Sequence, residues 1–232
     1  MINKDKSQWV IMIQISRVKR SKSMAIKTYD RLSHVYDLLA GSSEMPFINL
    51  GLELLRVEPG ESVLEIGCGT GKALVELCQQ VTKKGNVYGL DLSYGMLQAA
   101  SKRLTEIRYL ENAPLICGDG ASLPYASGVF SSVFMSFTLE LFDTPEIPLV
   151  LAESWRVLEP DGRIGVVAML KPIQASLIVR LYEWLHAHFP TYVDCRPIIA
   201  GEMIRSAGFR LEKQLVKSMW GLPVELLLAR KG

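Results

Sequence analysis

Val63-Leu64-Glu65-Ile66-Gly67-Cys68-Gly69-Thr70-Gly71 is the stretch that decides the fold of this 232-residue chain. Residues 62–66 are a short β-branched and apolar run after the turn pair Pro59-Gly60, which is typical of a buried strand in a parallel sheet. Three alternating glycines follow, and residues 72–81 then carry apolar side chains at helical spacing. A strand, a glycine turn and a helix form the first half of a βαβ unit. The sequence therefore predicts an α/β fold with a ligand site at this turn.

The spacing of the glycines argues against a dinucleotide as that ligand. A dinucleotide fingerprint, G-x-G-x-x-G, needs glycine at position 72, where this chain has Lys72. Glu65 would repel a pyrophosphate but attract a sulfonium or ammonium cation. Asp91 ends a second apolar run, residues 86–90, and a carboxylate at this strand tip can accept from both hydroxyls of a ribose. A ligand with a ribose, a cationic end and no phosphate fits these residues, as S-adenosylmethionine does.

Four sequence blocks, in this order and at these intervals, carry a resemblance to a known family. They are Glu65-Ile66-Gly67-Cys68-Gly69-Thr70-Gly71, Gly89-Leu90-Asp91-Leu92-Ser93 with Met96 and Leu97, Gly118-Asp119-Gly120, and Trp155-Arg156-Val157-Leu158-Glu159-Pro160-Asp161-Gly162-Arg163. Residue 63 to about residue 170 resembles class I S-adenosylmethionine-dependent methyltransferases. Within them it is most similar to the branch of the ubiquinone/menaquinone C-methyltransferases (UbiE-like) and the soluble phosphatidylethanolamine N-methyltransferases.

The resemblance implies a fold and a cofactor. The fold is a Rossmann-like, doubly wound, seven-stranded and mostly parallel sheet with an antiparallel last strand. The cofactor is S-adenosyl-L-methionine, and S-adenosyl-L-homocysteine is its product. The outer segments usually choose the substrate, and the resemblance fades there.

The predicted cofactor-binding residues lie in or near these blocks. Met96 falls in the first turn of a predicted helix over 94–107, near an adenine face, with plain core packing as the alternative. Asp119 can accept a hydrogen bond from the adenine amino group or only form a turn. The full predicted set is Glu65, Gly67, Cys68, Gly69, Gly71, Asp91, Leu92, Met96, Asp119, Gly120, Ser136 and Phe137.

Two residues are predicted to act near the reaction itself. Glu140 stands where many members of the resembled family have histidine, and it can bind a cationic substrate group, act as a weak base or cap a helix. Tyr-Asp pairs begin at Tyr29 and Tyr36 in a predicted helix over 25–40. The resemblance implies that such a pair helps to close over the cofactor. Tyr36 is the preferred candidate, whereas Tyr29 can equally pack on the sheet.

One residue is predicted to hold the substrate, and no metal site is expected. Arg196, in a polar and aromatic loop, can clamp a phosphate or carboxylate, or pair with Asp194. His186 and His188 are two residues apart in a predicted helix over 172–189, so they point to different faces and do not form a metal pair.

Composition fits one α/β domain with short appendages. The chain is 49% hydrophobic and 22% charged with a net charge of +2, which gives no overall nucleic-acid footprint. The four cysteines form no C-x-x-C pair, as expected for reduced thiols in a cytoplasm. No apolar run approaches the ~20 residues of a membrane span. We expect one methyltransferase domain over 24–232, with a helical cap at 24–56 and substrate-side helices at 171–207.

Residues 1–23 differ in charge from the rest of the chain. They hold six lysines and arginines against one aspartate, around the apolar run 9–15. One interpretation is a disordered or mis-assigned extension, with Met24 as the effective start. The other is a basic, apolar anchor to an anionic membrane surface. The second would make a cytoplasmic protein peripheral to the inner membrane surface.

The sequence predicts in-line methyl transfer to a small or lipid-like acceptor. A quinone precursor and an aminolipid both remain open. The apolar helix favours a hydrophobic acceptor, and Glu140 slightly favours an amine. A macromolecule (protein or RNA) methyltransferase is one alternative, but it would need a basic stripe with aromatics or an Asn-Pro-Pro-Tyr type tetrad, and neither is present. A non-catalytic S-adenosylmethionine-binding protein is the other. The sequence does not indicate an oligomeric state.

Overall fold

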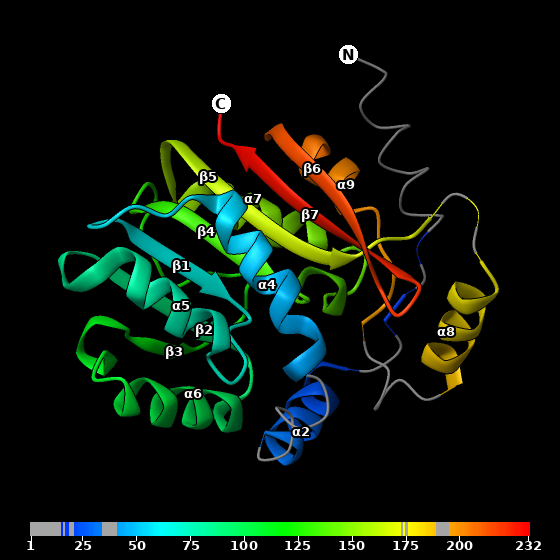
Figure 1. The fold of residues 1–232 in the computed structure, drawn as a ribbon, viewed down its shortest axis with the longest axis horizontal. Helices are drawn as coiled ribbons and strands as arrows, with labels where there is room; N and C mark the ends of the chain where they lie inside the picture. The colour runs from blue at the N-terminus through cyan, green and yellow to red at the C-terminus, as the bar shows by residue number, and fades with distance from the viewer. Residues whose placement is uncertain are drawn as a thin grey trace.

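A mostly parallel sheet forms the centre of the computed structural model (Figure 1). The structure describes residues 15, 17–18, 21–33, 41–172, 174, 176–188 and 195–232. Within them the sheet has seven strands in the order β3-β2-β1-β4-β5-β7-β6. The strands are β1 (Ser62–Ile66), β2 (Asn86–Asp91), β3 (Leu115–Cys117), β4 (Phe130–Ser136), β5 (Leu158–Met169), β6 (Arg210–Met219) and β7 (Leu222–Arg230). β1 to β5 are parallel and β7 is antiparallel to both of its neighbours, so the predicted fold class is confirmed.

Helices cover both faces of the sheet (Figure 1). α4, α5 and α6 share one apolar core with the sheet, and α7 and α9 share the other. The described helices are α2 (Lys22–Leu32), α4 (Gly41–Leu55), α5 (Lys72–Val81), α6 (Tyr94–Glu106), α7 (Ile147–Val157), α8 (Leu177–His188) and α9 (Ala200–Ser206). Short 3-10 turns are η1 (Thr82–Lys84), η2 (Leu110–Asn112) and η3 (Leu139–Leu141).

The alternation of side chains along β1 explains this layering. Val63 packs into the core under α5, while Leu64 and Ile66 pack into the core under α7. β1 pairs with β2 on one side and with β4 on the other, and the helices that follow β1 and β4 lie on opposite faces. The chain therefore reverses its winding between these two strands, and open α/β sheets bind ligands at the carboxyl ends of strands at such a point.

Two elements are irregular, and a third differs from its predicted boundary. α4 begins at Gly41 and carries Pro46 inside the helix. β5 begins at Leu158, which pairs with Phe130 across a shift in register. α8 begins at Leu177, later than predicted.

The described part of residues 1–23 packs against the domain. Ile15 is 4% exposed and belongs to the core cluster under α7. α2 begins at Lys22, so the helix crosses the predicted boundary between 23 and 24. No helix in the described residues is both long and apolar enough to cross a membrane.

Candidate functional site

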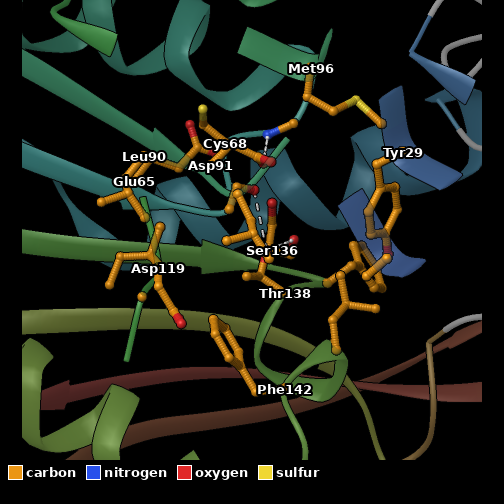
Figure 2. Close-up of a pocket in the computed structure, with 18 of the residues that line it drawn as sticks. Tyr29, Glu65, Cys68, Leu90, Asp91, Met96, Asp119, Ser136, Thr138 and Phe142 are labelled. Carbon is orange, nitrogen blue, oxygen red and sulfur yellow. Dashed lines mark hydrogen bonds between the residues drawn. The ribbon is translucent and has the colours of Figure 1, made fainter. Parts of the chain in front are cut away.

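A cavity lies at the carboxyl ends of β1, β2 and β4, where the winding reverses (Figure 2). Its walls come from the glycine turn, the tip of β2, the loops after β3 and β4, and α2. Eleven of the twelve predicted cofactor-binding residues line it: Glu65, Gly67, Cys68, Gly69, Asp91, Leu92, Met96, Asp119, Gly120, Ser136 and Phe137. The exception is Gly71, which instead begins α5 with φ 82° and packs on Ala100.

The glycine turn needs its glycines for two different reasons. Gly67 has φ 70°, and a Cβ there would lie 2.3 Å from the Thr138 Cγ2 atom, so close packing excludes a side chain. Gly69 has φ 52°, but a Cβ there would meet no atom within 4 Å. Because Gly69 lines the cavity, its bare backbone leaves a cradle that a ligand can fill.

Asp91 is held rigidly at the tip of β2. Its Oδ2 accepts from the Gly69 N–H at 2.8 Å (Figure 2). Its Oδ1 accepts from the Ser93 N–H at 2.8 Å. Burial raises the pKa of this carboxyl, although these backbone N–H groups oppose the shift. Each carboxylate oxygen has a second lone pair, so the side chain can still accept from a ribose diol.

Glu65 is the buried acid of the site. Its side chain is 1% exposed, and within the described residues its Oε2 atom has no hydrogen-bond partner. Burial, followed by the charge of Asp91, raises the pKa of Glu65 well above its ordinary value. An unsatisfied buried oxygen is unfavourable, and a cationic ligand group would satisfy it. The carboxylates of Glu65 and Asp91 and the bare backbone of Gly69 together fit S-adenosylmethionine.

Met96 and Asp119, which the sequence predicts to lie near the adenine of the cofactor, both line the cavity. Met96 lines the cavity and is also almost fully buried, so the core and cofactor interpretations are compatible. The Asp119 Oδ1 atom accepts from the Ala121 N–H at 3.0 Å, as in a turn, while Oδ2 pairs with the Lys22 Nζ atom. The turn at Asp119 and the burial of Met96 are thus present, while the contacts of both residues with adenine stay predictions.

α2 crosses the cavity and contributes Tyr29 to its wall (Figure 2). The neighbouring Asp30 fixes the helix, because its Oδ1 accepts from the Ser93 Oγ at 2.6 Å and from the Gly95 N–H at 3.0 Å. Tyr36, the preferred candidate from sequence, lies outside the described residues. Tyr29 is thus the member of the two Tyr-Asp pairs that the structure brings to the site.

Glu140 does not line the cavity, which argues against its predicted catalytic role. The side chain is fully buried, and its Oε1 accepts from the Met169 N–H at 3.0 Å. It therefore joins the loop after β4 to the end of β5. Thr138, Leu141 and Phe142 of the same loop do line the cavity. Sequence reasoning missed Leu141 and Phe142 because they carry no motif.

Arg196 also lies away from the cavity, and the structure does not support the prediction that it clamps a substrate anion. The guanidinium is fully buried and donates to the carbonyls of Glu140 and Phe142 and to the hydroxyl of Thr144, at 3.1, 2.5 and 3.0 Å. Burial lowers its pKa to about 10, so it stays charged at neutral pH. Arg196 therefore positions the loop whose Phe142 forms a cavity wall.

Comparison with known proteins agrees with this geometry. Residues 63–162 match the family described as a methyltransferase domain. The chain is 36% identical over 139 residues to the demethylmenaquinone methyltransferase of Lactobacillus johnsonii, covering 60% of this chain and 55% of that protein. It is 34% identical over 144 residues to the nocamycin O-methyltransferase of Saccharothrix syringae, covering 62% and 50%. The solved structure of the [4+2]-cyclase SpnF has a TM-score of 0.73 at 17% identity, covering 91% of this chain and 97% of that chain.

The fold, the cavity and the matched family point to the same class of protein. Residues 63–162 are similar to the methyltransferase-domain family, and the cavity that they help to form fits S-adenosylmethionine as a cofactor. Among named proteins, the chain resembles the demethylmenaquinone methyltransferases. The matched region spans about half the length of the curated relatives given above.

Replacing Arg196 by methionine tests its positioning role. We expect Arg196→Met to lower the free energy of unfolding by about 3–5 kcal/mol, because the loop loses three hydrogen bonds and the buried Glu140 loses a nearby cation. Arg210→Met, at an exposed arginine of β6, is the control and should change stability little. Denaturant unfolding monitored by circular dichroism measures both. Unchanged stability with weakened acceptor binding would restore the substrate-clamp prediction.

The raised pKa of Glu65 makes cofactor binding dependent on pH. A cationic ligand favours the ionised carboxylate, so binding lowers this pKa and releases a proton between the bound and free pKa values. Affinity for S-adenosylhomocysteine, which keeps the ammonium group, should therefore rise with pH across that window. Calorimetric titration in buffers of different ionisation enthalpy measures the proton count.

The matched variants for this test are Glu65→Gln and, at an exposed acid outside the cavity, Glu111→Gln. Glu65→Gln should abolish both the proton release and the dependence of affinity on pH, whereas Glu111→Gln should retain them. The same proton release in all three proteins would show that Glu65 is not the group that titrates on binding.

Proposed function

We propose that this chain is an enzyme that binds S-adenosylmethionine in the cavity and transfers its methyl group to a small apolar acceptor. The observation that carries the proposal is the placement of Glu65 and Asp91 beside the open backbone of Gly69. Two carboxylates at a glycine turn disfavour a pyrophosphate and suit a ligand with a ribose and a cationic end. The function therefore follows from the site and not from the fold alone.

Methyl transfer needs few acidic or basic groups from the protein. The sulfonium, when bound, supplies an already activated methyl group. The chain's own residues need to align the acceptor and exclude water, and such positioning can supply up to ~7–11 kcal/mol of the barrier. α2 and the loop 138–142 enclose the cavity from two sides, which suits this task. The position of Glu140 outside the cavity is compatible with a reaction that needs no strong base there.

The apolar part of the cavity lining favours an apolar acceptor. The lining includes Val18, Ala25, Tyr29, Ile48, Phe137, Leu141 and Phe142. The argument for an amine rested on Glu140, which does not line the cavity. We therefore place a quinone-precursor ring, methylated on carbon, ahead of an aminolipid. The resemblance to demethylmenaquinone methyltransferases supports this order.

The outer face of α8 supports a hydrophobic acceptor from another direction. Leu177, Leu181 and Trp184 follow helical spacing and are more than half exposed, while Val179 and Tyr182 face inward. An exposed apolar stripe of this kind is typical of a surface that meets an apolar molecule.

The first test is calorimetric titration of S-adenosylmethionine and S-adenosylhomocysteine into wild type and Asp91→Ala. We expect saturable binding by wild type and an affinity lowered at least tenfold in the variant, because the ribose loses both acceptor oxygens. Glu111→Ala, at an exposed acid outside the cavity, should bind like wild type. Circular dichroism checks that each variant is folded. No binding by folded wild type would overturn the proposed function.

Turnover then separates an enzyme from a binding protein. Formation of S-adenosylhomocysteine is measured with demethylated quinols and aminolipids as acceptors. We expect turnover with the quinols. Turnover with aminolipids alone would correct the acceptor, and cofactor binding without turnover on any acceptor would favour a non-catalytic protein.

A further inference from the structure

The described cations before α2 and at its start are paired with acids at the rim of the cofactor cavity. Arg17 donates to both carboxylate oxygens of Asp143, at 2.8 and 2.6 Å, and the Val18 N–H donates to the same carboxylate at 3.0 Å. Lys22 Nζ lies 2.5 Å from Asp119 Oδ2 and 2.6 Å from Glu146 Oε1. Two of the six cations that suggested a membrane anchor therefore serve the cavity of this chain.

The two ends of α2 are attached in different ways. At its carboxyl end, Asp30 accepts two hydrogen bonds at the start of α6, beside the fully buried Ser93. At its amino end, Lys22 is 41% exposed and its partners Asp119 and Glu146 are 30% and 29% exposed. Exposed ion pairs are weak and are screened by salt, whereas buried hydrogen bonds are not. The Asp30 end can therefore act as a hinge and the Lys22 end as a latch.

Lys22 and the cofactor need the same atom. Asp119 Oδ1 accepts from the Ala121 N–H and Oδ2 accepts from Lys22, so an adenine amino group that approaches Oδ2 would have to share it with the Lys22 ammonium group or displace that group. Hydrogen bonds to Asp119 and Glu146 outweigh partial burial and raise the pKa of Lys22, so the latch is charged at neutral pH. Glu146 provides a second carboxylate to which Lys22 can remain paired when Asp119 is taken.

We propose that Lys22 gates the cofactor cavity by holding Asp119 until the cofactor displaces it, while Asp143 holds Arg17 and Val18 at the rim. The proposal rests on the proposed function, because it takes S-adenosylmethionine as the molecule that enters. It assigns Lys22 as a residue that sets the rate and affinity of cofactor binding without touching the acceptor.

The gate is tested by the association rate of S-adenosylhomocysteine. Surface plasmon resonance measures this rate on wild type, Lys22→Met and Lys27→Met. Methionine keeps the length of the side chain and removes the charge. Lys27 is an exposed lysine of the same helix outside the cavity, so its variant is the matched control. We expect S-adenosylhomocysteine to associate with Lys22→Met at least threefold faster than with wild type, and to bind it more tightly. Added salt screens the ion pairs of Lys22 and should therefore speed association with wild type. This effect of salt should be mostly lost in Lys22→Met. Lys27→Met should behave like wild type.

Amide hydrogen exchange on the ligand-free protein gives a readout that needs no cofactor. Lys22→Met should exchange faster at residues 17–25, with no change in α6 beyond the hinge. Equal association rates and equal exchange in both lysine variants would overturn the gate. Slower or weaker binding by Lys22→Met would also overturn it, and would make Lys22 a direct cofactor ligand. If wild type binds no cofactor at all, the proposed function fails, and the exchange result alone decides whether the latch exists.

Discussion

The hydrogen bond from the Gly69 N–H to the Asp91 carboxylate is the interaction on which the site depends. It ties the turn after β1 to the tip of β2, and the other oxygen of the same carboxylate holds the Ser93 N–H. Ser93 in turn caps α6 and donates to Asp30 of α2. One carboxylate thus fixes the glycine turn, the second strand, α6 and, through Ser93, the helix over the cavity. The ribose contact and the placement of α2 consequently share one physical origin.

A second constraint is the surplus of acids around the cavity. Glu65, Asp91, Asp119, Asp143 and Glu146 all line it. Burial and the charge of Asp91 raise the pKa of Glu65, so the inner acids destabilise one another's charged form. The repulsion is offset in two ways. A bound cationic ligand would neutralise the inner acids, and Arg17 and Lys22 form ion pairs with the acids at the rim. The acids that suit a cationic cofactor therefore also hold Arg17 and Lys22 at the rim of the cavity.

The sequence predicted the parts of the site that are encoded locally. The turn 65–71, Asp91 and Asp119 could be placed because strand, turn and helix signals lie within a few residues of each one. Glu140 and Arg196 could not, because their roles depend on each other across 56 residues of chain. Residues 1–23 show a related difficulty, and their membrane-anchor interpretation stays a prediction. Clustered lysines and arginines predict an anionic partner, but composition does not say that two of them, Arg17 and Lys22, pair with acids at the rim of the cavity of this chain.

The weak sequence similarity of the outer segments has a structural explanation in α8. Its inward face meets the segment before α9 through the Tyr182 hydroxyl, which donates to the Cys195 carbonyl at 2.7 Å. The Cys195 thiol lies 3.9 Å from the carbonyl of Phe137, a cavity residue, and the next residue, Arg196, holds the loop that carries Phe142. A change in α8 can therefore shift two cavity walls without touching Gly69 or Asp91. The outer contacts can therefore change the choice of acceptor while the cofactor site stays constant. For this reason the sequence predicts the cofactor but does not identify the acceptor.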